Sequence, residues 1–300
     1  MTKKFVMMLI AVIMVAALAI TSSATGATDV VNPLDTGKEI LYYLFWTCDD
    51  KLEADVEDLQ VTLSLTDQQM EELKELGLTE RIQNQGLSET YSSNARASVQ
   101  AFNIAIDEKT VARNEAISEI LGNQVDEFRD WIAEWWAIER NYRINTSIST
   151  YAGINRVSNI WATQYVPNTS GAVEVALPDK YIKFANLGWD NTYSNPPYTV
   201  NVYNPKTNQS LINVRVDEVG PWNVNDNYWD SNRRVFSDVP LGVPEAYKAY
   251  YDDYNNGKDE SGRTVLNPAG IDLSTAAAAK IGFPGTYSSG FVDVRYEYLP

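Results

Sequence analysis

Two short stretches in the second half of the chain hold carboxylates in settings that could support acid–base chemistry. One reads Asp217-Glu218-Val219-Gly220-Pro221-Trp222, and the other contains Ile271-Asp272-Leu273-Ser274. Gly220 permits backbone conformations barred to other residues and Pro221 fixes the next φ, so we expect this structural turn to aim Glu218. Asp272 precedes an alanine-rich segment, where a carboxylate can also act simply as a helix cap. Glu218 and Asp272 are therefore the candidate catalytic carboxylates, with Asp217 in reserve.

The composition removes several other chemistries. The chain has no histidine, which excludes histidine-based triads and histidine-ligated zinc. Its net charge of −16 argues against nucleic acid and anionic lipid as partners. The run from Asp252 to Asp259 is rich in oxygen ligands, but Gly257 falls where an EF-hand loop needs a ligand. We therefore expect neither a bound metal nor a cofactor.

Aromatic residues gather near these carboxylates. Trp222 is followed by an insertion, residues 223–266, that includes Tyr228 and Trp229, and Trp189 lies upstream. Exposed rings beside carboxylates can bind sugars by stacking, and on that hypothesis these four residues bind substrate, with Trp222 and Trp229 exposed. The alternative is that the rings form local core at one end of a barrel.

The N-terminus indicates export. Lys3 and Lys4 precede an uncharged run from Phe5 to Ile20, and small residues follow up to Ala27. The apolar run is shorter than the roughly 20 residues of a membrane span. Residues 1–27 therefore read as a signal peptide, with a retained anchor as the alternative. We expect a secreted or cell-envelope protein with no stable membrane span after signal removal. Cys48, the single cysteine, is either buried or pairs with another chain.

Residues 28–145 have a helical pattern. Thr66 is placed to cap a helix that begins at Asp67, and Gly77 is a candidate stop for it. A second apolar stripe predicts one long amphipathic helix. Its members are Val111, Ile117, Ile120, Leu121, Val125, Phe128, Trp131, Ile132 and Trp135. Through Leu65-Thr66-Asp67-Gln68-Gln69, the segment also resembles helical periplasmic proteins with an LTxxQ motif.

Residues 146–300 change to short alternating runs. The expected strands cover 160–166, 173–176, 181–185, 198–203, 211–216 and 291–298, separated by turn sequences such as Asn204-Pro205. Many short strands at this spacing predict a small barrel or sandwich. The fold class is therefore α+β, with a helical hairpin or bundle before a β domain.

The order of motifs in the second half resembles the double-psi β-barrels of the rare-lipoprotein-A-like group, relatives of expansins. In that group a hairpin ends in Asp-Arg-Gly-Pro, and an Ile-Asp-Leu-Ser helix opening precedes a Gly turn and a last strand. Here Glu218-Val219-Gly220-Pro221, Ile271 to Ser274 and the terminal strand match over roughly 165–298. The resemblance implies a six-stranded double-psi barrel in which Glu218 and Asp272 lie close together.

The resemblance also implies a bacterial protein that acts on cell-wall polysaccharide. If it is an enzyme, it would be a lytic transglycosylase or glycoside hydrolase, with Glu218 as general acid assisted by Asp272. The alternatives are a non-catalytic polysaccharide-binding or wall-loosening module, or a structural envelope protein. Two departures matter: Glu218 replaces the family's Asp, and the family's histidine is absent.

Overall fold

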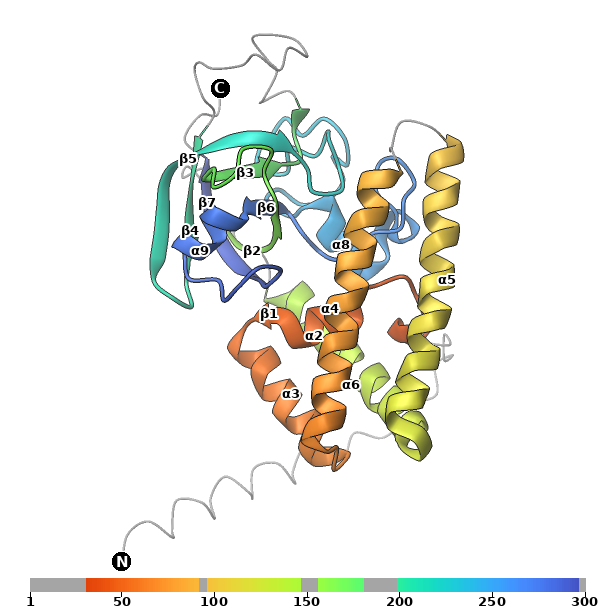
Figure 1. The fold of residues 1–300 in the computed structure, drawn as a ribbon. Helices are drawn as coiled ribbons and strands as arrows, with labels where there is room; N and C mark the ends of the chain where they lie inside the picture. The colour runs from red at the N-terminus through yellow and green to blue at the C-terminus, as the bar shows by residue number, and fades with distance from the viewer. Residues whose placement is uncertain (1–30, 92–95, 147–155, 181–198, 297–300) are drawn as a thin grey trace, which may run out of the picture. The chain divides into compact units, whose positions relative to one another are not determined.

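The computed structural model describes residues 31–91, 96–146, 156–180 and 199–296, and from Asn32 onward the chain forms one compact unit. The expected signal segment 1–27, the expected strand 181–185 and Trp189 lie outside the described residues. Figure 1 shows a group of helices from the first half of the chain and strands from the second.

The first half is helical, as its pattern predicts. A short 3-10 turn, η1, precedes the helices, and another, η2, separates the last two. The elements are η1 (Pro33–Asp35), α2 (Ile40–Trp46), α3 (Asp50–Thr62), α4 (Asp67–Thr90), α5 (Arg96–Leu121), η2 (Gly122–Gln124) and α6 (Val125–Asn145). Among the described residues, no helix is both long and apolar enough to cross a bilayer.

Helix α4 begins where the sequence predicts but continues past its expected end. The Thr66 hydroxyl accepts a hydrogen bond from the Gln69 N–H, and Gln69 reciprocates, which completes a capping box. Gly77 does not stop the helix. A Cβ placed there would lie 2.8 Å from the backbone carbonyl carbon of Leu41 and 2.8 Å from the nitrogen of Tyr42. The glycine is therefore used for close packing of α4 on α2.

The stripe expected to form one long helix is divided between α5 and α6. Gly122 has φ +55°, a left-handed conformation that interrupts the α-helix and favours glycine. Ile117 and Leu121 in α5 and Phe128, Ile132 and Trp135 in α6 are all buried. The apolar stripe therefore predicts buried residues of both helices, but the chain turns between α5 and α6 instead of forming one helix.

The second half contains a closed six-stranded mixed barrel, which confirms the α+β class. Its strands are β2 (Arg156–Tyr165), β3 (Glu174–Leu177), β4 (Thr199–Asn204), β5 (Gln209–Val219), β6 (Ile271–Ser274) and β7 (Ser289–Tyr296). They pair in the order β7-β2-β6-β3-β5-β4, and β4 closes the ring on β7. The β2–β6 and β3–β5 pairs are parallel, and the other pairs of the ring are antiparallel.

Two small elements complete the sheet region. β1 (Thr47–Cys48) pairs in parallel with β7 outside the ring, and burial raises the pKa of the Cys48 thiol to about 11. After β6 comes helix α9 (Thr275–Lys280), whose N-cap is Ser274; the Ser274 hydroxyl accepts from the Ala277 N–H at 3.2 Å. The segment 271–274, expected to open this helix, is therefore a strand, and Ser274 rather than Asp272 is the cap.

The helices and the barrel share one core. Tyr43 of α2 lies 6.3 Å from Trp136 of α6 and 6.1 Å from Trp161 of β2, measured between ring centroids. It also contacts Tyr250 and Tyr251 at 5.8 and 6.0 Å. Those two residues belong to α8 (Glu245–Asp252), the helix of the insertion, which is followed by η3 (Tyr254–Gly257). The barrel is thus packed against the helices through a continuous set of rings.

The insertion encloses carboxylates that have little access to water. Glu245 is fully buried, and burial raises its pKa to about 8, although the Asn223 amide donates to it at 2.8 Å. Asp226 accepts from the Glu245 backbone N–H at 2.7 Å and pairs with Arg233, and burial raises its pKa to about 6. Ionising these buried groups costs free energy.

Substituting alanine at two glycines of α4 tests the close contact with α2. Gly77→Ala should lower the free energy of unfolding by about 1–3 kcal/mol, because its Cβ would overlap the α2 backbone. Gly86→Ala is the control: nothing lies within 4 Å of its Cβ, so the better helix former should add up to about 1 kcal/mol. Urea unfolding followed by circular dichroism measures both. Equal stabilisation by the two variants would contradict the packing.

The buried Glu245 predicts a stability that falls with pH. Because its pKa is raised on folding, its contribution is complete below its ordinary value of 4.5 and is lost as pH rises through about 8. At about 1.4 kcal/mol per pKa unit, the change from 4.5 to about 8 corresponds to a total loss of about 5 kcal/mol. Glu245→Gln should flatten the curve of unfolding free energy against pH, whereas Glu75→Gln, exposed on α4, should not. An unchanged slope in Glu245→Gln would refute this assignment.

Candidate functional site

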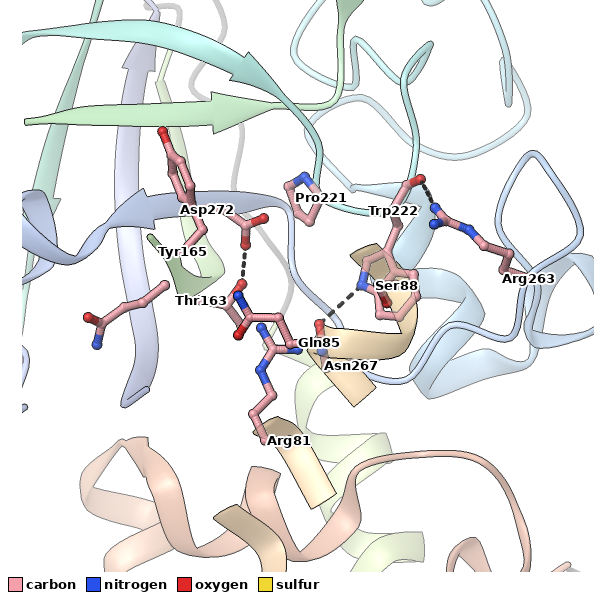
Figure 2. Close-up of a pocket in the computed structure, with 11 residues that line it drawn as sticks. Arg81, Gln85, Ser88, Thr163, Tyr165, Pro221, Trp222, Arg263, Asn267 and Asp272 are labelled. Carbon is pink, nitrogen blue, oxygen red and sulfur yellow. Dashed lines mark hydrogen bonds between the residues drawn. The ribbon is translucent and has the colours of Figure 1, made fainter. Parts of the chain in front are cut away.

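A pocket of about 140 Å³ lies where α4 meets the barrel (Figure 2). Its walls come from α4, from the C-terminal end of β2, from the turn after β5 and from the segment that leads into β6. The lining residues are Arg81, Gln85, Ser88, Thr163, Gln164, Tyr165, Pro221, Trp222, Arg263, Asn267 and Asp272. Three residues singled out in the sequence, Pro221, Trp222 and Asp272, are thus brought together.

The strand register explains how the two candidate carboxylates are related. Asp272 of β6 pairs with Thr163 of β2 on one side and with Ala176 of β3 on the other, and Ala176 pairs with Glu218 of β5. These residues form one row across four strands and share a face of the sheet. At about 4.8 Å per strand, the Cα atoms of Asp272 and Glu218 are roughly 10 Å apart. Glu218 therefore lies near the pocket without being part of its lining.

Asp272 is a half-buried carboxyl group that faces this pocket. Its removal from water raises its pKa, and two neighbours oppose that effect: the Thr163 hydroxyl, which donates to Oδ1, and the positive charge of Arg81. Figure 2 shows the Asp272 carboxyl and the Arg81 side chain extending toward Thr163 from opposite sides. An aspartate with a raised pKa can hold a proton closer to neutrality and so donate it.

Tyr165 and Glu174 form a second titratable pair beside Asp272. The Tyr165 hydroxyl donates to Glu174 Oε1 at 3.1 Å. Burial raises the pKa of Tyr165, and the charges of Glu174, Asp272 and Glu218 raise it further. Burial also raises the pKa of Glu174. Acidic groups on β3, β5 and β6 therefore act on one another across the same part of the barrel.

The turn after β5 presents an indole to the pocket. Gly220 has φ +144° and Trp222 has φ +55°, so the backbone folds back on itself around Pro221. The Trp222 Nε1–H donates to Asn267 Oδ1 at 3.1 Å, and the Arg263 Nη2–H donates to the Trp222 carbonyl at 2.7 Å. The turn therefore supplies Pro221 and Trp222 to the pocket lining, whereas Glu218, which precedes it on β5, is not among the described lining residues.

Three other residues that the sequence suggested for the site are not among the residues that line the pocket. Tyr228 is fully buried and donates to the Gly270 carbonyl at 3.0 Å, and Trp229, expected to be exposed, is only 5% exposed and stacks on Tyr296 at 4.5 Å. These two rings form local core because the loop carrying them closes over β7. Asp217 pairs with Arg215 at 2.7 Å and does not line the pocket.

Sequence reasoning missed Arg81, Gln85 and Ser88. They belong to α4, far from the barrel in sequence, and no local motif marks them. Residue spacing at 3–4 positions does place Arg81, Gln85 and Ser88 on one helix face, but the same spacing describes every helix surface. Only the packing of α4 against the barrel identifies which face lines the pocket.

Comparisons with known proteins assign no chemistry to this pocket. The family model that matches is described as a domain of unknown function, DUF8814, and it covers residues 156–295, the span of the barrel strands. No curated protein and no solved structure matches the sequence. The matched range omits α4, so it does not include the helical wall of the pocket.

Removing either neighbour that lowers the pKa of Asp272 should raise that pKa. Thr163→Val deletes the hydrogen bond while keeping the side-chain shape, and Arg81→Gln deletes the positive charge. Titration of the Asp272 carboxyl carbon by NMR should show a higher midpoint in both variants. Thr110→Val, which removes another buried hydroxyl on α5, should leave the midpoint unchanged. A midpoint unaffected by both substitutions would show that Asp272 does not face these groups.

Proposed function

We propose that this protein is exported and acts on cell-wall polysaccharide, cleaving glycan strands with Asp272 as the general acid. The observation that carries the proposal is the position of Asp272. Its carboxyl group faces a pocket, its pKa is raised by burial, and its partner is a hydroxyl group rather than a set of backbone amides. Glycosidic cleavage requires such a group to protonate the leaving oxygen.

The resemblance to rare-lipoprotein-A-like and expansin-like double-psi barrels supports the substrate class. The two motifs that carry that resemblance, the Gly220-Pro221 turn and the segment Ile271 to Ser274, contribute Pro221 and Asp272 to the same pocket. The closed six-stranded barrel is compatible with the barrel fold that the resemblance implies. The apolar segment within residues 1–27 supports export.

The roles of the two carboxylates differ from those that the sequence suggested. Asp272 is the better acid, because it faces the pocket and its pKa is raised. Glu218, roughly 10 Å away in backbone distance, is a candidate for the second carboxylate that hydrolysis uses. If a hydroxyl of the sugar itself attacks, as in lytic cleavage of peptidoglycan, Asp272 can serve alone as acid and base.

A non-catalytic binding or wall-loosening module is the second candidate, and the size of the pocket favours it. A volume of about 140 Å³ is small beside the roughly 300–1,000 Å³ typical of ligand pockets. Such a pocket can hold one sugar unit or one substituent, with Trp222 as its flat wall. A structural role in an envelope assembly would need neither Asp272 nor Trp222.

A digestion assay tests the catalytic proposal. The purified protein is incubated with peptidoglycan and, separately, with β-glucans, and soluble fragments are read by mass spectrometry. Asp272→Asn should lower the rate of fragment release by about 10²–10⁴-fold, the usual contribution of a general acid. Because the proton must be present, the rate should also fall as pH rises through the pKa of Asp272.

The controls separate the carboxylates from one another. Asp217→Asn, on β5 but outside the pocket, should keep the wild-type rate. Glu218→Gln distinguishes the two reactions: a large loss with reducing-end products indicates hydrolysis, and retained activity with anhydro ends indicates lytic cleavage. If no fragments are released but the protein binds either polymer in a pull-down, the protein is a binding module and the catalytic proposal is wrong.

A further inference from the structure

We infer that the pocket binds an acidic sugar unit, with the carboxylate of that sugar held by Arg81 from α4. The inference rests on the proposed function and names its substrate class. It makes the helical half of the chain a part of the binding site, because Arg81 lies on a helix outside the barrel.

The pocket is lined mainly by side chains that donate hydrogen bonds or that can either donate or accept them. Two guanidinium groups, Arg81 and Arg263, line it, together with the polar side chains of Gln85, Ser88 and Asn267. Asp272 is the one carboxylate among the described residues that line the pocket. A ligand that fits this lining must offer acceptor oxygens and a negative charge, as a uronic acid or another carboxylate-bearing sugar does.

Arg81 is held beside the pocket by its ion pair with the buried Glu39, and that contact leaves other N–H donors of the guanidinium available. Its side chain is 12% exposed, and its guanidinium lies 5.5 Å from the centroid of the Tyr42 ring, which limits its movement. Its hydrogen bond to Glu39 is 3.5 Å long, at the outer limit for such a bond. Glu39 receives shorter bonds from Asn84 and Asn267, at 3.2 and 2.9 Å. A guanidinium has five N–H donors, so Arg81 retains the capacity to bind a carboxylate through two of them.

Arg263 has a different role, because its Nε and Nη2 donate to groups of the protein that hold the turn in place. Its Nε donates to Asp259 at 2.7 Å, and its Nη2 donates to the Trp222 carbonyl at 2.7 Å. It therefore fixes the turn that carries Trp222 and adds positive charge to the pocket. The indole of Trp222 can then stack on a sugar ring while Arg81 binds its carboxylate.

Asp272 does not oppose this binding when it carries a proton. A neutral carboxyl group does not repel the carboxylate of the ligand, and its O–H can donate to a sugar oxygen. The raised pKa of Asp272 favours that protonated form. A bound carboxylate would also offset the positive charge of Arg81, which favours protonation of Asp272 further. Substrate charge and acid catalysis therefore support one another at this site.

The test compares methyl β-D-glucuronide with methyl β-D-glucoside, which differ only at C6, a carboxylate in the first and a hydroxymethyl group in the second. Affinities for the full chain are measured by NMR shift titration at low ionic strength. In the wild-type protein we expect the glucuronide to bind at least about tenfold more tightly, as a single charge-assisted pair provides. Arg81→Gln should reduce this preference to within about twofold while keeping affinity for the glucoside, and Arg81→Lys should keep part of it.

Arg129→Gln is the matched control, since Arg129 pairs with Asp35 at 2.6 Å and does not line the pocket. It should retain the full preference for the glucuronide.

Two results would overturn the inference. One is equal affinity of the wild-type protein for the two glycosides, and the other is a preference for the glucuronide that persists in Arg81→Gln. The digestion assay separates this inference from the proposed function. If glycans are cleaved but both glycosides bind equally, the proposed function is supported and the role of Arg81 is wrong. If the glucuronide binds selectively but no glycan is cleaved, the role of Arg81 is supported and the catalytic proposal is wrong.

Discussion

Glu39, at the start of α2, is a fully buried carboxylate whose side-chain partners come from two distant parts of the chain. Arg81 and Asn84 of α4 contact it at 3.5 and 3.2 Å, and Asn267, just before β6, donates to it at 2.9 Å. A buried charge is tolerated only when its partners are in place, and removal of one partner from such a group typically costs about 3–5 kcal/mol. The requirement to satisfy Glu39 therefore fixes Arg81 and Asn267, two residues of the pocket, relative to one another.

The aromatic core acts together with this polar contact. Tyr43 lies in van der Waals range of rings from α6, β2 and α8, and its hydroxyl donates to Glu139 at 2.6 Å while accepting from Tyr251 at 2.8 Å. Interior packing of this density resists small displacements. The helices and the barrel consequently position the pocket together, and the boundary expected near residue 145 lies between segments that share a core.

The sequence by itself determined the features that depend on neighbouring residues. The capping box of Thr66 and Gln69, the left-handed φ of Gly220 and the apolar stripes of α5 and α6 follow from local sterics, local hydrogen bonds and helical periodicity. The alternation of Val200 with Val202 and of Val214 with Val216 predicted β4 and β5 for the same reason. The α+β class could be read at this level, whereas Asp272 was selected through the resemblance of its motif to a known barrel family.

Only the tertiary structure decided which of these features meet. The segment 271–274 is a strand because β2 and β3 provide hydrogen-bonding partners on both sides, which no local pattern of four residues can specify. Gly77 remains helical because α2 packs against it, and Trp229 is buried because Tyr296 covers it. Arg81 joins Asp272 in one pocket although the two are far apart in sequence. The physical reason is common to all four cases: burial, strand pairing and long-range electrostatics depend on atoms that the chain brings together only after folding.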